Sequence, residues 1–159
     1  MSAITIKSPL MQTNTGFRPP VTPSQAGEVI AVRTQVAVGT TLPINSILQM
    51  VPLPPECVPV DVILDVTDLD SNVTKTATFS VGILNEDEDD LVSTKLFISQ
   101  ADTPQAGGVK RADQVNGFRV ARHATLPQTI AIKVHAAAAT AKAGTVGLTV
   151  LYRAASFGV

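Results

Sequence analysis

The sequence predicts an all-β protein built as a single β-sandwich. Several short segments alternate apolar and polar residues with a period of two, and turns rich in Gly, Pro, Asn and Asp separate these segments. The composition agrees, because the 159 residues include 11 prolines and 10 glycines and only 16% of them are charged. Seven or eight short strands with one helical excursion are typical of a sandwich, which we predict to be a jelly roll.

A chain of this length forms one domain comfortably, but its first 27 residues differ from the rest. They read MSAITIKSPLMQTNTGFRPPVTPSQAG and contain four prolines among many Ser, Thr, Asn and Gln residues. Proline fixes φ and removes a backbone donor, so we expect this stretch to form neither a helix nor an interior strand. We therefore predict an extended, Pro-rich N-terminal arm over residues 1–27 and a β-sandwich body over residues 28–159.

Two segments of the body give the clearest strand patterns. In residues 59–68, PVDVILDVTD, the predicted inward face carries Val60, Val62, Leu64 and Val66. In residues 76–84, TATFSVGIL, the predicted inward side chains are Ala77, Phe79, Val81 and Ile83. The sequence DLDSN at residues 68–72 separates the two segments, and Asp and Asn favour turns. We therefore expect the two segments to pair as the strongest hairpin of the chain.

The rest of the body alternates between weaker strand patterns and turns. Residues 91–101, LVSTKLFISQA, are predicted to form a short helix, with a strand as the alternative. PLPPE (52–56) indicates a corner, EDEDD (86–90) a solvated loop, and the alanine-rich segment 135–144 is interpreted as a loop between two strands. The remaining strands are expected at residues 28–38, 46–51, 118–123, 129–137 and 145–153.

The net charge of −1 conceals an uneven distribution along the chain. Residues 28–90 hold two basic residues against eleven acids, whereas residues 91–159 hold eight basic residues against two acids. If the two halves stay apart in the fold, an acidic and a basic half favour head-to-tail contact with other copies or with a complementary lattice. If the fold interleaves them, the asymmetry disappears.

Residues with catalytic potential are few and poorly spaced. His123 and His135 fall in or beside strand patterns, and neither the CxxC or HxxxH spacing of a zinc site nor a GxSxG nucleophile motif occurs. Cys57 is the only cysteine, which rules out an internal disulfide framework and fits a small, inert side chain. We therefore expect no enzymatic activity and no cofactor.

Three carboxylates are weak candidates for a metal site. Asp65, Asp68 and Asp70, together with the acidic run at 86–90, offer the oxygen ligands that Ca²⁺ prefers. The spacing does not match a calcium loop, since no glycine follows Asp70 and no glutamate falls in register for bidentate binding. Solvation of two loop tips is the favoured interpretation, and we expect no metal.

The composition also indicates whether nucleic acids or membranes are expected partners. Lys110, Arg111, Arg119 and Arg122 suggest a basic strip, but the net charge is slightly negative and the chain has one tyrosine and no tryptophan for base stacking. We therefore expect no nucleic-acid partner. No window approaches the ~20 consecutive apolar residues of a membrane helix, and the N-terminus lacks the apolar core of a signal peptide, so we expect no membrane partner.

Several stretches together resemble a family of capsid decoration proteins. These stretches are AITIKSP (3–9) leading to GFRPP (16–20), ILDVTDLDSN (63–72) followed by TFSVGIL (78–84), and FISQADTPQAGGVKRA (97–112). The chain resembles the small decoration or cement proteins that stabilise the heads of tailed bacteriophages. The resemblance implies a β-sandwich on the outer capsid surface that bridges neighbouring major capsid protein subunits. It also implies synthesis in the cytoplasm of a bacterial host, and it carries over no catalytic residues.

This resemblance suggests a role for the N-terminal arm. We expect residues 1–27 to lie across a neighbouring capsid subunit or a second copy, with proline lowering the entropy lost on docking. Self-association as a dimer or trimer on the capsid is also expected. The predicted contact residues are Ile4, Ile6, Leu10, Phe17, Arg18, Pro19 and Pro20.

Two other functions stay open at this point. One is a different part of the virion, such as a head–tail joining protein or a tail protein, which sequence does not separate from a cement protein. The other is a glycan-binding jelly-roll module. Sugar sites use exposed aromatic platforms, and five Phe and one Tyr, most of them at core-like positions, make the glycan-binding function less favoured.

Overall fold

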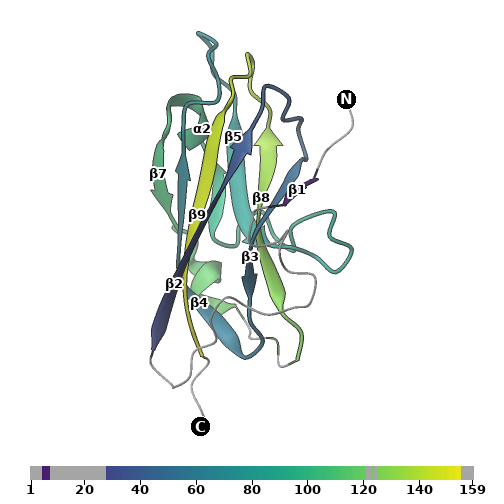
Figure 1. Ribbon diagram of the computed structural model, residues 1–159, viewed down its shortest axis with the longest axis vertical. Coiled ribbons are helices and arrows are strands. Elements are labelled where there is room, and N and C mark those ends of the chain that lie inside the picture. The colour runs from purple at the N-terminus through teal and green to yellow at the C-terminus, as the bar shows by residue number, and fades with distance from the viewer. Residues whose placement is uncertain (1–4, 8–27, 121–122, 124, 155–159) are drawn as a thin grey trace.

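In a computed structural model, which describes residues 5–7, 28–120, 123 and 125–154, the chain forms two β-sheets packed face to face (Figure 1). The all-β sandwich predicted from the sequence is therefore confirmed. One sheet has the order β1-β3-β8-β5-β6, with bounds Thr5–Lys7, Ile47–Leu53, Gln128–Ala136, Thr78–Ile83 and Ile98–Ala101. The other has the order β2-β9-β4-β7, with bounds Val29–Val38, Gly144–Ala154, Cys57–Val66 and Gly108–Arg111.

The pairing of the strands is nested about the middle of the chain. β5 pairs with β6, β4 with β7, β3 with β8 and β2 with β9, always antiparallel. Further antiparallel pairs, β4 with β9 and β5 with β8, complete the two sheets. The body thus has the connectivity of one long hairpin rolled up into two layers, so that segments far apart in the sequence lie side by side.

The core lies between the sheets and follows the predicted alternation. In β2, Val32, Thr34, Val36 and Val38 are buried, whereas the alternate residues Arg33, Gln35 and Ala37 are exposed. The four inward residues predicted for residues 76–84 are all buried: Ala77, just before β5, and Phe79, Val81 and Ile83 in β5. The strands expected at 28–38, 46–51, 129–137 and 145–153 are present within a few residues of their predicted limits, and 137–143 is a loop as expected.

A second, smaller apolar cluster covers the outer face of one sheet. Ile47 of β3 and Ala131 of β8 pack with Leu84 and Leu91, which flank the acidic loop. β3 is consequently buried along its whole length. This face of the β1-β3-β8-β5-β6 sheet is therefore closed by the chain that follows β5.

The predicted inward face of residues 59–68 is wrong at one position. β4 carries a register shift between Pro59 and Asp61 where it pairs with β9, so Val60 is the extra, half-buried residue of a bulge. The bulge reverses the alternation and leaves Asp61 only 9% exposed, while Val62 is completely buried. A period-two pattern read from the sequence does not reveal such an insertion.

The predicted hairpin between residues 59–68 and 76–84 is also wrong. β4 pairs with β9 and β7, whereas β5 belongs to the other sheet. The loop between them crosses from one sheet to the other and hydrogen-bonds to the loop before β9, with the Ser71 N–H donating to the carbonyl oxygen of Thr140 at 2.9 Å. Turn-forming residues predicted the reversal of the chain but not the partner of each strand.

Two further expectations were wrong in their element type. Residues 91–101 form turns and then β6 rather than a short helix, because Phe97 and Ile98 enter the main core; the strand alternative is thus confirmed for Ile98–Ala101. The short helix α2 comes later, at Thr103–Ala106, where Pro104 occupies the first turn. In place of the strand expected at 118–123, the structure has a 3₁₀ helix, η1, at Val115–Arg119; residues 121 and 122 lie outside the described part.

A short strand of the N-terminal segment joins the sandwich. β1 pairs in parallel with β3, with Thr5 opposite Ile47 and Lys7 opposite Gln49, and Ile6 packs against the main core. The sequence predicted no strand here. Proline excludes an interior strand, but β1 is a short strand at a sheet edge. The nearest proline, Pro9, lies beyond its end, so it interrupts no main-chain hydrogen bond of β1.

Candidate functional site

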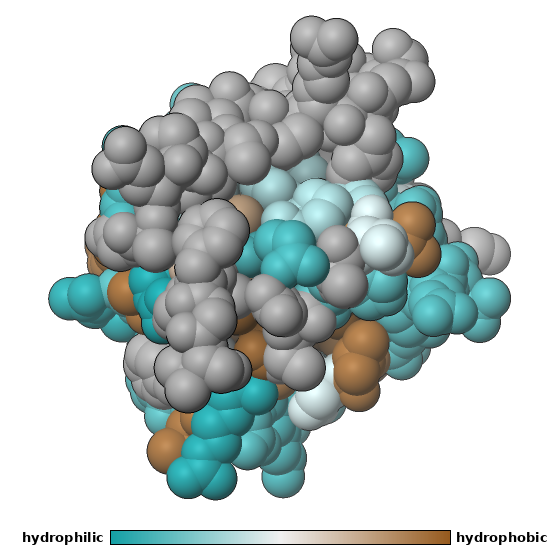
Figure 2. Space-filling model, turned by 90° about the horizontal axis from the view of Figure 1, so that it is seen from below, coloured by the Kyte–Doolittle hydropathy of each residue, from teal (hydrophilic) through white to brown (hydrophobic). Residues whose placement is uncertain are grey.

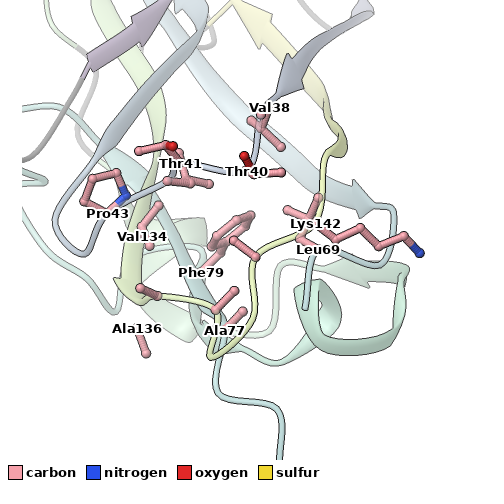
Figure 3. A pocket seen from close by; sticks show the side chains of 15 residues that line it. Val38, Thr40, Thr41, Pro43, Leu69, Ala77, Phe79, Val134, Ala136 and Lys142 are labelled. Carbon is pink, nitrogen blue, oxygen red and sulfur yellow. The ribbon is translucent and has the colours of Figure 1, made fainter. Parts of the chain in front are cut away.

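The loops at one end of the sandwich enclose an apolar pocket. This pocket end consists of the loops at 39–46, 67–77 and 137–143 together with α2, and it lies uppermost in Figure 1. The pocket has a volume of about 130 Å³. Figure 3 shows side chains of its lining, which include Val38, Thr40, Thr41, Pro43, Leu69, Ala77, Phe79, Val134, Ala136 and Lys142.

The pocket opens directly onto the core between the two sheets. Phe79 and Val134 lie among the residues that line it, and each is only 1% exposed. Small residues from the alanine-rich loop leave space above these two side chains. Lys142 is the one charged residue among those that line the pocket. An apolar group of roughly benzene size is therefore the kind of ligand that this pocket accommodates.

A buried carboxylate holds the loops of the pocket end together. Asp70 is completely buried and accepts backbone N–H groups from both loops at 2.9–3.3 Å, donated by Asn72, Thr76, Ala77, Ala139 and Thr140. Burial raises the pKa of this carboxyl, but the hydrogen bonds from the backbone outweigh burial and hold the pKa far below its usual range. Asp70 is therefore an ionised clamp between residues 72–77 and residues 139–140.

A second carboxylate joins the same end through lysines. Asp68 lies 3.2 Å from Lys75 Nζ and 3.5 Å from Lys142 Nζ, and Lys75 also donates to the carbonyl oxygen of Gln105, just beyond the first turn of α2. The hydrogen bond from Lys75 lowers the pKa of the Asp68 carboxyl, with further help from the Asp70 N–H and the charge of Lys142. Lys75 and Lys142 thus share one carboxylate, which offsets part of their positive charge.

The three weak metal candidates do not share a site. Asp70 serves the loop clamp, Asp68 pairs with lysines, and Asp65 accepts from Arg33 at 2.7 Å on the outer face of the β2-β9-β4-β7 sheet. Within the described residues, no group of three or more His, Cys, Asp or Glu side chains could hold a metal ion. These carboxylates act as structural acceptors in this fold.

The acidic loop lies at the opposite end of β5 from Asp70. Residues 86–89 are exposed, as predicted, but the loop is anchored at several points. Asn85 Oδ1 accepts the N–H groups of Asp89 and Asp90, and Lys133 Nζ lies 2.7 Å from Asp90. The hydrogen bond from Lys133 lowers the pKa of the Asp90 carboxyl. Gln49 Nε2 donates to Glu88 at 3.0 Å, while its own oxygen is buried without a partner.

The histidines and the cysteine occupy structural positions. His123 Nδ1 accepts the N–H of Leu126 at 2.9 Å and so closes a turn, and His135 lies in β8. Burial, together with the charge of Glu56, raises the pKa of the Cys57 thiol, which favours the unreactive protonated form. The Glu56 N–H donates to the carbonyl oxygen of His123 at 2.9 Å, so the turn at His123 is fixed beside the start of β4.

The charge asymmetry of the sequence does not persist as two halves in space. Each sheet contains strands from both halves of the chain, and ion pairs cross between them. Arg111 pairs with Asp61, Lys133 with Asp90, and Lys142 with Asp68. The interleaved alternative is therefore the one that the structure supports. Seen from the end opposite the pocket, the visible hydrophobic residues form small separate patches among hydrophilic ones (Figure 2).

Of the predicted contact residues, one lies in the described part of the chain. Ile6 is half-buried in β1 against the core of its own chain. The other six, Ile4, Leu10, Phe17, Arg18, Pro19 and Pro20, lie outside the described residues. Sequence reasoning missed the pocket and the Asp70 clamp. The sequence signal for the pocket was the alanine run at 136–139, and the signal for the clamp was an aspartate in a turn. Each becomes informative only once the loops at 67–77 and 137–143 are known to meet.

Comparisons with known proteins show which solved structures this chain resembles. No protein-family model matches the sequence, and no curated protein matches it. A chain from the solved capsid of Ralstonia phage GP4 is 30% identical, with a TM-score of 0.83, over 96% of this chain and 99% of that chain. A chain from the capsid asymmetric unit of cyanophage Pam1 is 24% identical, with a TM-score of 0.66, over 88% of this chain and 94% of that chain, and shows the shared fold.

The fold and the candidate site define a β-sandwich protein whose features suit binding and assembly. Its described part combines loop ends held by buried hydrogen bonds, an apolar pocket and several ion pairs. No described helix is long and apolar enough to cross a membrane. Because the similarity to the GP4 chain covers nearly the whole of both chains at 30% identity, the protein belongs to the same family of phage capsid proteins.

Proposed function

We propose that this protein is a structural component of a phage virion that binds the outer surface of the capsid and cements neighbouring major capsid protein subunits. The observation that carries the proposal is the full-length similarity to a chain of the GP4 capsid. The two chains correspond over 96% and 99% of their lengths with a TM-score of 0.83, so this one is proposed to occupy an equivalent place in its own particle. A structural role without enzymatic activity follows from that place.

The physical character of the molecule supports attachment to a lattice. Only 16% of its residues are charged, against about 25% in typical globular proteins, which favours coverage of part of the surface by other proteins. The pocket end is held by hydrogen bonds to Asp70 and offers an apolar cavity, with Lys142 at its lining paired to Asp68. A capsid lattice repeats each contact many times, so modest affinity per copy gives substantial reinforcement.

The N-terminal segment is proposed to extend these contacts. Ile6 anchors it to the body through β1, while five of the other predicted contact residues, from Leu10 to Pro20, lie in the segment between β1 and β2. That segment has 20 residues from Ser8 to Gly27, a length whose extended reach is on the order of 60–70 Å. Because β1 and β2 hold both ends of this segment in the sandwich, it can project from the body by at most about half of that length, on the order of 30–35 Å.

The body is further proposed to be a jelly roll. Its eight strands β2–β9 form two four-stranded sheets, to one of which β1 is added. The nested antiparallel pairs are what two interlocking Greek keys produce. This architecture leaves the outer face of the β2-β9-β4-β7 sheet and the loop ends for contacts, which suits a protein that bridges subunits.

The proposal is tested on purified particles. A cryo-EM reconstruction should show this protein on the outer capsid surface, in contact with more than one major capsid protein subunit. In a binding assay with particles that lack it, a variant without residues 8–27 should keep its folded circular dichroism spectrum and lose occupancy. Density confined to the neck, tail or a fibre would reject the cement function in favour of another virion part.

A further inference from the structure

The apolar pocket exists because its walls are built from short side chains. Phe79 and Val134 border it from the core, and each is only 1% exposed. An alanine side chain ends at Cβ, so it leaves open the space that a longer side chain fills. Five alanines line the pocket: Ala77, Ala136, Ala137, Ala138 and Ala141. Together they leave a space of about 130 Å³ beside the core.

The polar side chains of the lining leave the inner part of the pocket apolar. Lys142 lines the pocket with its aliphatic stem, while its Nζ points away (Figure 3) and lies 3.5 Å from the Asp68 carboxylate. The other polar side chains of the lining are the hydroxyls of Thr40 and Thr41. A bound water needs two to four polar partners, and an isolated charge is costly to bury. The pocket therefore favours an uncharged, apolar occupant.

Hydrogen bonds between the loops fix the walls of the pocket. The Lys142 N–H donates to the carbonyl oxygen of Leu69 at 2.9 Å, and both residues line the pocket. On the other side, the Asn45 N–H donates to the carbonyl oxygen of Val134 at 2.9 Å and holds the loop at 39–46. The Asp70 clamp adds further bonds between the two remaining loops. A ligand therefore meets a preformed pocket and orders few protein groups when it binds.

We propose that the pocket is a binding site for a small, uncharged aromatic molecule of about the size of benzene or toluene. An apolar cavity of about 150 Å³ binds benzene, and the volume of this pocket is close to that value. The ligand ring contacts the ring of Phe79, and aromatic pairs gain from offset or edge-to-face packing. This site is additional to the cement function and does not depend on it.

The shape of the pocket end favours a free molecule over a side chain of another protein. The tips of the loops at 67–77 and 137–143 project beyond the loop at 39–46 (Figure 1), and Val73 in the first of these tips is fully exposed. A flat protein surface meets these tips before it reaches the pocket. A free molecule is not restricted in this way, because it carries no main chain that must stay outside.

An NMR titration of the full chain with toluene tests the site. The methyl signals of Leu69, Ala77 and Val134 should shift and saturate, with a Kd of about 1 mM or lower for a ligand of this size. The second apolar cluster is the internal control, and its methyl signals should not move; it consists of Ile47, Leu84, Leu91 and Ala131. Shifts that do not saturate, or equal shifts in both clusters, would overturn the proposal.

Filling the pocket provides the second test. Ala138 lines the pocket and is half-buried, whereas Ala143 is exposed and lies outside the lining. Ala138→Leu should weaken toluene binding by at least about tenfold, because the added side chain takes the space of the ligand. Ala143→Leu is the matched control and should bind as the parent does. Toluene should raise the Tm of the parent and of Ala143→Leu, but not that of Ala138→Leu. Equal binding by the two variants contradicts the site.

Two further measurements separate the possible failures. A crystal of the parent protein under xenon pressure needs no variant, and xenon should lie beside Phe79 and Val134; a pocket without xenon counts against the proposal. In the particle assay, Ala138→Leu and Ala143→Leu should reach the same occupancy. A loss confined to Ala138→Leu would assign the pocket to a side chain of a capsid subunit and reject a free ligand. A parent protein that binds no particle rejects the cement function and leaves the toluene result unchanged.

Discussion

Replacing Asp70 with asparagine should destabilise the protein through the loop clamp. One carboxylate oxygen accepts the N–H groups of Asn72 and Thr140, and the other accepts those of Thr76, Ala77 and Ala139. An amide keeps a single acceptor oxygen, so at least two of these N–H groups lose their partner in either orientation. At about 1–3 kcal/mol for each unsatisfied donor, the free energy of unfolding should fall by about 2–6 kcal/mol, out of about 5–15 for a typical domain.

Chemical denaturation followed by circular dichroism measures this loss. Asp65→Asn is the matched control, because its pair with Arg33 is largely exposed and should contribute less than about 1 kcal/mol. The pKa of Asp70 is lower in the folded than in the unfolded protein, so its contribution is complete above about pH 4 and is lost as the pH falls. The difference between parent and variant should therefore shrink in acid. A loss at pH 7 no larger than that of the control would refute the clamp.

Three further predictions follow from single contacts. Tyr152 is the one tyrosine of the chain, and burial, with a smaller effect from Cys57, raises its pKa to about 12. Phenolate absorbance should therefore appear well above pH 10. A titration midpoint at pH 10 would contradict the burial of this side chain. Because protonation of Tyr152 favours the folded state, its stabilisation is lost as the pH rises from 10 through about 12. Gly82→Ala should lower the unfolding free energy by about 1–3 kcal/mol, since a Cβ there lies 2.7 Å from the Ser93 carbonyl oxygen; unchanged denaturant midpoints would show that this loop yields. Lys133→Met should loosen the acidic loop, detected as faster amide exchange at Leu91 and Val92 with β2 unaffected.

The sequence predicted those features of the fold that depend on local alternation. Val32, Val36 and Val38 in β2, and Phe79 and Val81 in β5, are buried as their spacing indicates. Pairing between strands depends on contacts across the whole chain, which periodicity does not encode. For this reason the sequence did not predict the bulge at Val60, and it wrongly predicted that β4 and β5 pair in one sheet.

The candidate site was less predictable because it arises from loops that meet only in the fold. Asp70 was identified in the sequence for its carboxylate, but its role depends on N–H groups of residues 139 and 140, nearly half the chain away. The pocket requires three loops at once, and no single segment signals it. By contrast, the acidic loop was correctly predicted as solvated because its charges alone require water.

The low charge of the sequence and the two unlike sheets lead to one conclusion about where partners bind. The segment that follows β5 covers the outer face of the β1-β3-β8-β5-β6 sheet, where Leu84 and Leu91 fill the space over Ile47. The β2-β9-β4-β7 sheet instead exposes Ala31 and Val109 on its outer face. If other proteins cover part of this molecule, the surface available to them is the outer face of the β2-β9-β4-β7 sheet, next to the β2 edge. Charged or bulky substitutions at Ala31 should therefore reduce assembly more than substitutions in the exposed acidic loop, and equal effects would place the contact elsewhere.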